Sequence, residues 1–307
     1  MPQPVPSPAI AVSPEVREAA DTGAAVVALE STIFTHGLPR PRNLEVAREA
    51  ERQLRGAGVV PATVGVVDGV PTVGLTDAEI ERLSTDDTAV KVSIRDLPVA
   101  AAKRLCGGTT VAATSLLAHR TGITVFSTGG LGGVHHGAGT TFDESADLVA
   151  LASTPVLVVS AGVKSILDIP ATLERLETLN IPVVGYRTTR YPGFYVADSG
   201  HAVEYAVDGP EEAAAIVRAR NALGLRAAVL VANPVPEEHQ LDPAVHDRVV
   251  AEAWATAERE GVVGHDITPF LLDHILAATG GTSLAVNIAV YRNNIAVGAA
   301  IALALAG

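Results

Sequence analysis

The alternation of β-branched runs with amphipathic stretches most constrains the fold of this 307-residue chain. The β-branched runs predict strands at 25–29, 63–67, 90–92, 124–127, 156–160, 182–185 and 227–231. Helical periodicity between them predicts helices at 43–54, 110–119, 171–178 and 211–222. Strands that alternate with helices form a largely parallel sheet that is covered on both faces. Asp68-Gly69 between two apolar runs predicts a hairpin, so we expect a mixed sheet.

The composition indicates one well-buried domain, because 48% of the residues are hydrophobic and only 18% are charged. We predict a single catalytic α/β domain at 14–307. We expect the segment 1–13 to be a flexible proline-rich arm, and it lacks the basic start and apolar centre of a signal peptide. The apolar run 295–307 is too short to span a bilayer. We expect it to form a buried helix, or a helix that packs against a neighbouring subunit.

Charge and cysteine content exclude several classes of protein. The net charge of -12 argues against nucleic acid as a partner, because such binding depends on clustered lysine and arginine. No membrane partner is expected either. The lone Cys106 excludes an internal disulfide framework and a cysteine-rich metal site. A chain without disulfides fits the cytoplasm, where we expect this protein to reside.

Polar side chains lie at or directly after the ends of several predicted strands. They are Glu30, Lys91, Thr128, Lys164 and Asn233. The carboxyl ends of parallel strands meet at one edge of a sheet, so we expect these groups to converge on a site there. Each also has a structural explanation: Glu30 could satisfy backbone donors near a turn, and Lys91 could extend from a strand end into solvent.

Lys164 has the weakest structural explanation, because it stands where an apolar strand appears to lead into a helix. The positive end of the helix dipole and the apolar surroundings both disfavour a cation there. The neutral amine is therefore favoured, and a neutral amine is a nucleophile. Beside a sugar or carbonyl substrate it indicates imine chemistry.

The glycine-rich segment 128–139 is a candidate for close approach of the backbone to an anion. It matches neither a Walker loop nor a dinucleotide fingerprint. His135 and His136 within it could bind a metal. Adjacent histidines rarely point at one ion, however, so a solvated or supporting role is the alternative.

Three carboxylates, Asp143, Glu144 and Asp147, follow with Ser145 between them. They could cap a helix. They could equally hold a hard cation such as Mg²⁺ or Mn²⁺ that keeps several waters. The spacing leaves both possibilities open.

Several separated motifs stand in the order of a known family. They are 28–33, His36-Gly37, Lys91-Val92-Ser93, 129–135, Thr141-Phe142-Asp143 with Ser145-Ala146-Asp147, Ala161-Gly162 with 164–168, and Ala232-Asn233-Pro234. On these motifs the chain resembles the pseudouridine-5'-phosphate glycosidase family, whose fold is called indigoidine synthase A-like. The likeness extends from about residue 25 to the C-terminus.

The resemblance implies a three-layer α/β/α sandwich with a large mixed, mostly parallel sheet, assembled as a homotrimer. It implies a C-glycosidase that reversibly cleaves pseudouridine 5'-phosphate to uracil and ribose 5-phosphate. One Mn²⁺ per subunit would assist, with Mg²⁺ as an alternative. By position, Glu30 would be the proton donor, Lys164 the nucleophile and Asp143 the metal ligand. Substrate contacts would come from Lys91, Val111, Thr128, Ser145, Ala146, Asp147 and Asn287.

The chemistry explains why such a site contains a lysine. An ordinary glycosidase protonates the leaving oxygen, whereas the leaving atom of a C-nucleoside is C5 of uracil, which has no lone pair. With Glu30 supplying a proton to open the ribose, Lys164 can bond C1' and form an imine that assists cleavage of the carbon–carbon bond. Lys91 would stay cationic for the phosphate or the ring hydroxyls, so the two lysines need opposite environments.

The chain departs from the family pattern at Glu144, His136, Ser160, Val163 and Gly193. None of these departures removes a catalytic group, but they bear on phosphate affinity and on the base that is accepted. Two other functions are compatible with the sequence. One is a biosynthetic C-glycosyl synthase that joins ribose 5-phosphate to another aglycone. The other is a non-catalytic phosphosugar-binding or regulatory protein, against which the set of Glu30, Lys91, Asp143 and Lys164 argues.

Overall fold

The computed structural model describes residues 10–262 and 267–307, apart from the side chains of 268 and 269. The strands are β1 (Ala11–Val12), β2 (Val26–Leu29), β3 (Val60–Val67), β4 (Val70–Val73), β5 (Val90–Val92), β6 (Gly107–Thr109), β7 (Val125–Ser127), β8 (Leu157–Ser160), β9 (Val183–Tyr186), β10 (Tyr205–Val207) and β11 (Val229–Ala232). The helices are α1 (Pro14–Thr22), α2 (Thr32–Thr35), α3 (Arg42–Gly56), α4 (Asp77–Thr85), α5 (Leu97–Lys103), α6 (Val111–Arg120), α7 (Ala138–Thr141), α8 (Ala146–Leu151), α9 (Ile169–Thr178), α10 (Pro210–Ala222), α11 (Pro243–Glu260), α12 (Ile267–Ala278) and α13 (Thr282–Ala306).

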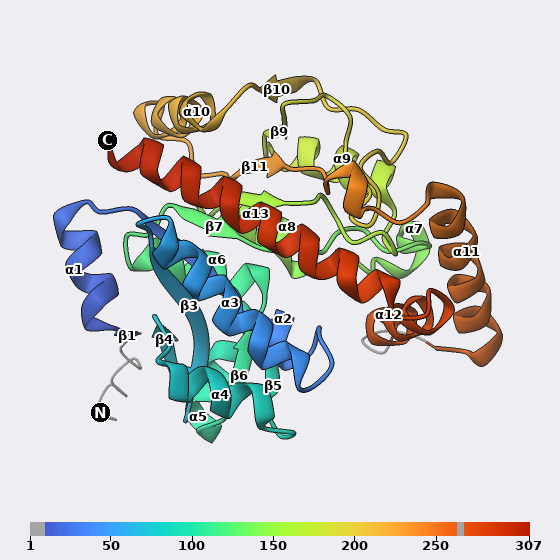
Figure 1. Ribbon diagram of the computed structural model, residues 1–307, viewed down its shortest axis with the longest axis horizontal. Helices are drawn as coiled ribbons and strands as arrows, with labels where there is room; N and C mark the ends of the chain where they lie inside the picture. The colour runs from blue at the N-terminus through green and yellow to red at the C-terminus, as the bar shows by residue number, and fades with distance from the viewer. Residues whose placement is uncertain (1–9, 263–266) are drawn as a thin grey trace.

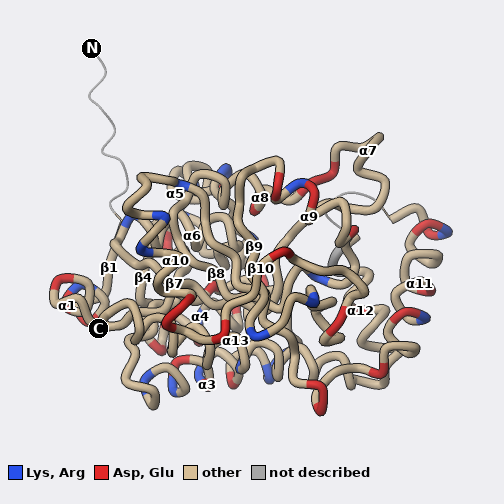
Figure 2. Tube along the Cα trace, turned by 90° about the horizontal axis from the view of Figure 1, so that it is seen from above, with Lys and Arg blue, Asp and Glu red and all other residues tan. Residues whose placement is uncertain are grey.

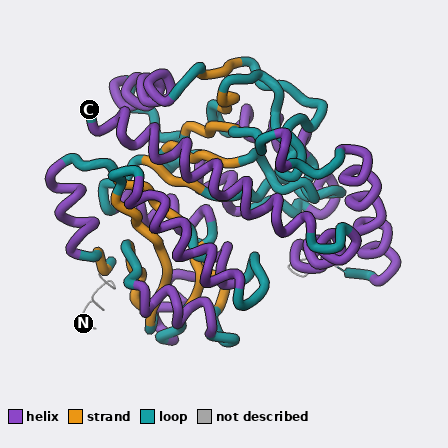
Figure 3. The backbone as a smooth tube through the Cα atoms, in the orientation of Figure 1, coloured by secondary structure: helices purple, strands orange, loops and turns teal. Residues whose placement is uncertain are grey.

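These elements form an α/β fold around one mixed sheet, as predicted (Figures 1 and 3). The strand order is β1-β4-β3-β2-β7-β8-β11-β9-β10, and β5 joins through β6, which pairs with β3. The described strands pair in parallel except where β3 meets β4 and β6. The predicted hairpin is the β3–β4 turn, in which Asp68 and Gly69 both take positive φ. That conformation matches the right-handed twist of the flanking strands.

The seven predicted strands and four predicted helices are all present, with ends shifted by at most a few residues. The sequence did not predict β1, β6 and β10. β6 reads Gly-Gly-Thr, a composition that is poor in strand-forming residues. β1 pairs with β4 and begins at Ala11, so regular structure starts inside the segment predicted as a flexible arm. The first nine residues of that arm lie outside the described residues.

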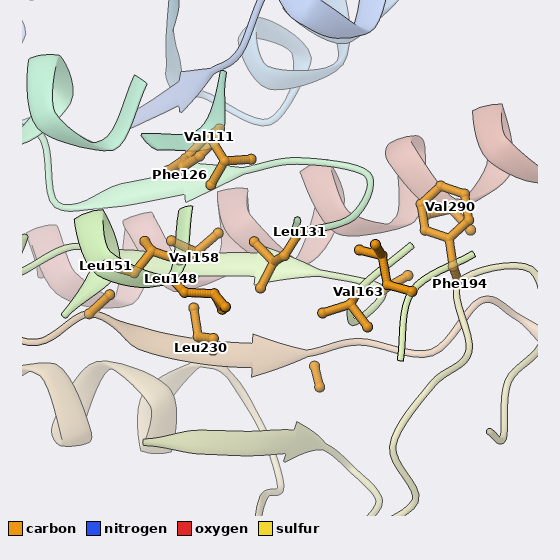
Figure 4. Packing of buried hydrophobic residues seen from close by; sticks show 14 of the residues in the cluster. Val111, Phe126, Leu131, Leu148, Leu151, Val158, Val163, Phe194, Leu230 and Val290 are labelled. Atoms are coloured by element: carbon orange, nitrogen blue, oxygen red, sulfur yellow. The ribbon is translucent and has the colours of Figure 1, made fainter. Parts of the chain in front are cut away.

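Apolar side chains alternate along the central strands and supply a core on each face of the sheet. On β2, Ala28 faces one cluster and Val27 faces the other. The first cluster includes side chains from α6 and α8, such as Leu117 and Leu148, and Figure 4 shows part of it around Phe126. The second lies under α3, α10 and α13, which cover the near face of the sheet in Figure 1.

Helix α13 extends the predicted C-terminal helix at 295–307 by more than three turns toward the N-terminus. By length and composition alone α13 could cross a membrane, but more than half of its most apolar window is buried within the fold. It contacts α3, α10 and strands β2, β7 and β8. The apolar character of α13 is thus that of a core helix.

Candidate active site

The order of the sheet brings the predicted site residues to one edge. Strands β2, β7, β8 and β11 are consecutive and parallel. Glu30, Thr128 and Asn233 directly follow three of them, and the loop that carries Lys164 follows β8. Lys91 comes from β5 and interacts electrostatically with both Glu30 and Lys164. The convergence expected from the sequence is therefore present.

Glu30 is a buried carboxylate held by two hydroxyl groups. Thr128 Oγ1 donates a hydrogen bond to Glu30 Oε1, and Thr32 Oγ1 donates one to Oε2. Burial raises the pKa of Glu30 above its ordinary value; the charge of Lys164 and the two hydroxyl donors oppose this shift. A carboxyl group with a raised pKa keeps its proton to higher pH, as a proton donor must.

Lys164 lies in the loop between β8 and α9, not at the start of the helix. Asp168 is the N-cap of α9, and its side chain accepts a hydrogen bond from the Ala171 N–H (3.0 Å). The helix thus begins at Ile169, several residues after Lys164, and the helix-dipole argument made from the sequence was wrong because that field decays within the first turn. The Asp168 carboxylate, not Lys164, occupies the positive end of the dipole.

The Lys164 loop is tied to the glycine-rich loop by backbone hydrogen bonds. Lys164 N–H donates to Leu131 O (3.1 Å), and Leu131 N–H donates to Gly162 O (3.0 Å). Tyr191 supports the loop from behind, because its buried hydroxyl accepts from the Val163 N–H (3.1 Å). Val163 and Leu131 are anchored in the apolar core (Figure 4). The nucleophile predicted from the sequence therefore sits on a rigid loop.

Lys91 projects from the middle of β5 and remains exposed to solvent. The surrounding protein nevertheless displaces enough water to lower the pKa of Lys91, and repulsion by Lys164 lowers it further, whereas Asp147 and Glu30 raise it. This direction is the reverse of the charge-favouring environment that we expected for Lys91. The two lysines share one site, and the charge of Lys164 disfavours the charge of Lys91.

The buried carboxylate of Asp147 joins the start of α6 to the glycine-rich loop. Its Oδ1 accepts a hydrogen bond from the Ala112 N–H at the start of α6, and its Oδ2 accepts one from the Gly132 N–H, both at 2.9 Å. A β-carbon at Gly132 would come within 2.8 Å of Asp147 Oδ2, so glycine is needed for this approach. The glycine-rich loop thus packs against this chain's own carboxylate, where the sequence had suggested a bound anion.

Of the three clustered carboxylates, Asp143 alone has no strong protein partner among the described residues. Glu144 accepts from Arg175 Nε (2.9 Å), and Asp147 is bonded to backbone amides. Asp143 Oδ2 lies 4.0 Å from His135 Nδ1, a buried atom without a hydrogen-bond partner. No group of three or more His, Cys, Asp or Glu side chains in residues 10–262 and 267–307 could hold a metal ion. Any ion here would depend on Asp143, with His135 beside it, and on water or substrate oxygens.

The other predicted substrate residues differ in how they can reach a ligand. Val111 is buried in the core at the first position of α6, so only its backbone can contact a substrate (Figure 4). Ser145 is the N-cap of α8, and its Oγ accepts from the Asp147 N–H (3.2 Å). Ala146 is exposed at the start of the same helix. A β-carbon on Gly129 would lie 3.6 Å from Asn287 Oδ1, which places Asn287 beside the glycine-rich loop.

Sequence reasoning missed two polar residues that support the site. Tyr191 holds the Lys164 loop, and Asn294 on α13 bonds to the backbone carbonyls of Thr128 and Gly129. Nothing near Tyr191 in the sequence marks it. Asn294 did carry a signal, because Asn287 and Asn294 are seven residues apart in an apolar run and so share one face of a helix.

The residues at which the chain departs from the family pattern mostly lie away from Glu30. His136 Nδ1 is 3.9 Å from Asp168 Oδ2, and its ring meets the edge of Trp254 at 5.1 Å. Ser160 and Val163 are buried in the core. His136 and Gly193 line a cavity of about 1300 Å³ behind the Lys164 loop. Glu30, Lys91 and Lys164 do not line that cavity.

Lysine and arginine residues are spread along the chain over several elements, and acidic residues stand among them (Figure 2). On α3, for example, Arg42 pairs with Glu45 and Glu49. Exposed pairs of this kind contribute little to stability.

Comparison with known proteins gives consistent results. The family model described as indigoidine synthase A like protein matches residues 15–304. A pseudouridine-5'-phosphate glycosidase of Saccharopolyspora erythraea is 72% identical over 296 residues, which are 96% of this chain and 98% of that protein. The glycosidase of the same name from Symbiobacterium thermophilum is 52% identical over 300 residues, 96% of this chain and 97% of that protein.

Two solved structures share the fold along nearly the whole chain. The prealnumycin C-glycosynthase AlnA, in complex with ribulose 5-phosphate, superposes with a TM-score of 0.91 at 37% identity and covers 98% of both chains. An indigoidine synthase A-like protein from Thermotoga maritima gives a TM-score of 0.88 at 36% identity and covers 97% of both chains.

Proposed function

Because this chain belongs to the indigoidine synthase A-like family, we propose that it is a pseudouridine-5'-phosphate glycosidase, an enzyme that cleaves a C-glycosidic bond. The observation that carries the proposal is the 72% identity to a glycosidase of that name over nearly the full length of both proteins. The site agrees with it: a buried carboxyl group with a raised pKa, Glu30, shares one sheet edge with the lysine-bearing loop after β8.

The proposed reaction begins with opening of the ribose. Lys164 bonds C1' of pseudouridine 5'-phosphate through its amine, and the C1'–O4' bond breaks as Glu30 gives its proton to the ring oxygen. The nitrogen then loses one of its protons, and the lone pair that this frees forms the imine while the C1'–C5 bond breaks. The electron pair of that bond goes to C5 of uracil, which takes up the proton that the nitrogen released. Water hydrolyses the imine and releases ribose 5-phosphate and the free lysine.

The choice between two isomeric substrates tests this function. We expect pseudouridine 5'-phosphate to be cleaved, and uridine 5'-phosphate, which places N1 where the site expects C5, to be left intact. Steady-state release of uracil from each isomer by the purified protein measures the discrimination, and we expect a ratio of at least about 10³ in kcat/KM, the range in which a misplaced polar group discriminates.

Two outcomes would contradict the glycosidase. Comparable rates on both isomers would show that the site does not distinguish the C-glycosidic bond. Absence of cleavage, combined with joining of ribose 5-phosphate to another aromatic aglycone, would favour a C-glycosyl synthase. That alternative has one observation behind it, the fold shared with the C-glycosynthase AlnA at 37% identity.

We further propose that one Mn²⁺ per subunit, or Mg²⁺, binds through Asp143. The support is chemical: among residues 10–262 and 267–307, Asp143 is a carboxylate without a strong protein partner, and it lies beside the buried His135 Nδ1, which has no hydrogen-bond partner there either. An ion bound there would supply positive charge for the substrate phosphate. In the chain itself, the hydrogen bond from His135 N–H to Asp143 O (3.0 Å) holds the turn that presents the carboxylate.

Asp143→Asn tests the metal site. The variant should bind Mn²⁺ at least about tenfold more weakly, because the change removes the charged ligand and leaves its shape. Titration calorimetry with Mn²⁺ measures this without turnover. Glu144→Gln is the matched control, since the Glu144 carboxylate is engaged by Arg175, and its affinity should equal that of the wild type. Unchanged affinity in Asp143→Asn would refute the assignment.

We also propose a homotrimer in the cytoplasm. Large apolar side chains remain on the surface of the single subunit, among them Phe142, Val149 and Leu223. Such side chains suit contacts between subunits.

The proposed location in the cytoplasm rests on the cysteine content. Cys106 is a free cysteine, which fits a reducing compartment.

A further inference from the structure

Asn294 fastens helix α13 to the end of strand β7, next to Glu30. The Asn294 side chain is fully buried, and its Nδ2 donates hydrogen bonds to Thr128 O (2.7 Å) and Gly129 O (3.1 Å). The backbone carbonyl of Asn294 accepts a hydrogen bond from the hydroxyl of Ser127 (3.2 Å). One residue of α13 thus holds three consecutive residues where β7 enters the site.

Asn233 completes this arrangement from the next part of the sheet. Its Nδ2 donates to Oδ1 of Asn294 (2.9 Å), and its own N–H donates to Ser160 O at the end of β8 (2.8 Å). Both donors of the Asn294 amide and one lone pair of its oxygen are therefore used. Three hydrogen bonds in different directions fix the orientation of this buried amide.

The helix lies directly against the strand at this point. Asn287, Asn294 and Gly298 recur at intervals of seven and four residues, which places them on one face of α13. A β-carbon at Gly298 would collide with the Ser127 hydroxyl. The face of α13 that carries Asn294 therefore packs directly against the end of β7, with no space for a larger side chain between them.

The consequence for catalysis passes through Thr128. Its hydroxyl donates to Glu30 Oε1, and the direction of that hydroxyl depends on how the Thr128–Gly129 backbone is held. We propose that Asn294, supported by Asn233, is a positioning residue for Glu30: it fixes the end of β7 so that the Thr128 hydroxyl meets the Glu30 carboxyl group. The role of Glu30 as proton donor rests on the proposed function, whereas the positioning itself does not.

The chain contains a matched control for the loss of a buried amide. Asn43 is also buried, and its Nδ2 donates to two backbone carbonyls, Phe34 O (2.7 Å) and Ser84 O (2.9 Å). Neither Phe34 nor Ser84 is bonded to Glu30. In each variant one of the two carbonyls keeps another donor, because Arg40 Nε also donates to Ser84 O and the Ala161 N–H also donates to Gly129 O. Asn294→Ala also leaves Asn233 Nδ2 without its acceptor, so it should lower the unfolding temperature somewhat more than Asn43→Ala does.

The decisive readout is the titration of Glu30. The ionisable groups around Glu30 include Lys164, Lys91, Asp147 and Tyr291, and Asn294→Ala changes none of them. The Thr128 hydroxyl lowers the pKa of Glu30, so releasing it should move the titration to higher pH. Carbon-13 NMR of the Glu30 carboxyl, assigned by its loss in Glu30→Gln, follows this titration without turnover. The alkaline limb of kcat/KM follows it during turnover.

We expect Asn294→Ala to shift the Glu30 titration to higher pH and to lower kcat/KM about tenfold to hundredfold, the range for a displaced catalytic group. Asn43→Ala should leave both within twofold of wild type. Thr128→Ala should shift the titration in the same direction, and adding Asn294→Ala to it should shift it no further, because the two residues act in series. Asn233→Ala should give a smaller shift of the same sign, and it serves as the test if Asn294→Ala does not fold.

An unshifted titration in the folded variant would overturn the proposal. So would an equal shift in Asn43→Ala, or a further shift in the double variant. The NMR titration also separates this proposal from the proposed function: a wild-type protein that fails to cleave pseudouridine 5'-phosphate refutes the glycosidase, while the titration still decides whether Asn294 positions Glu30.

Discussion

Lys164→Ala should abolish turnover of pseudouridine 5'-phosphate, with a loss of at least about 10⁴ in kcat, because it removes the atom that bonds C1'. Borohydride added to the wild-type protein with ribose 5-phosphate should reduce the imine and leave the sugar fixed to Lys164. The variant should give no adduct. Mass spectrometry of the digested protein locates the modification.

The sequence makes this experiment unusually clear, because the chain contains only three lysines, Lys91, Lys103 and Lys164. Lys103 is exposed at the end of α5, so Lys103→Ala is the matched control and should retain both the adduct and full activity. A sugar found on Lys91 would transfer the nucleophile to that residue. Turnover that persists in Lys164→Ala would end the imine mechanism for this protein.

Glu30→Gln should lower kcat by about 10² to 10⁴, the usual contribution of a general acid, while the fold is kept. The same change should stabilise the protein at pH 7 to 8. Burial raises the pKa of Glu30 above 4.5, so the folded state binds this proton more tightly than the unfolded state does. Stability is therefore lost as pH rises above 4.5, and glutamine removes that loss. Thermal unfolding should show a gain at pH 8 that shrinks toward pH 4.

Glu51 is the matched control for this prediction. It lies on α3, accepts a hydrogen bond from the Thr63 hydroxyl (2.6 Å), and burial raises its pKa as well. Glu51→Gln should change stability with pH in the same sense but leave kcat unchanged. Equal losses of activity in the two variants would mean that Glu30 contributes only to folding. A gain for Glu30→Gln that grew toward pH 4 would contradict the raised pKa.

The ionisable groups of the site cost the protein folding stability and supply its chemistry. Glu30, Asp147 and Lys164 are ionisable groups brought together at the end of a sheet whose interior is otherwise apolar. The carboxylates of Glu30 and Asp147 are held by hydroxyl and backbone donors, and backbone hydrogen bonds hold the loop that carries Lys164. Arrangements of this kind lower stability and favour chemistry.

The sequence alone determined the layers of this protein and the edge where its chemistry lies. Period-two and helical patterns are local, so the runs at β2, β7 and β8 identified strands with nearly correct ends. Parallel strands all point their carboxyl ends one way, so Glu30 and Lys164 had to share an edge although 134 positions separate them. The hairpin at Asp68-Gly69 followed from turn chemistry for the same local reason.

Only the tertiary structure decided what each polar group is bonded to. The spacing of the three carboxylates left each of them a candidate for a cation, and packing engaged Glu144 with Arg175 and Asp147 with the amides of Ala112 and Gly132. The bond of Asn294 to Thr128 was equally hidden. Such contacts join residues that are far apart in the chain, and they depend on how helices and strands pack, whereas the patterns that can be read from a sequence extend over only a few turns or one strand.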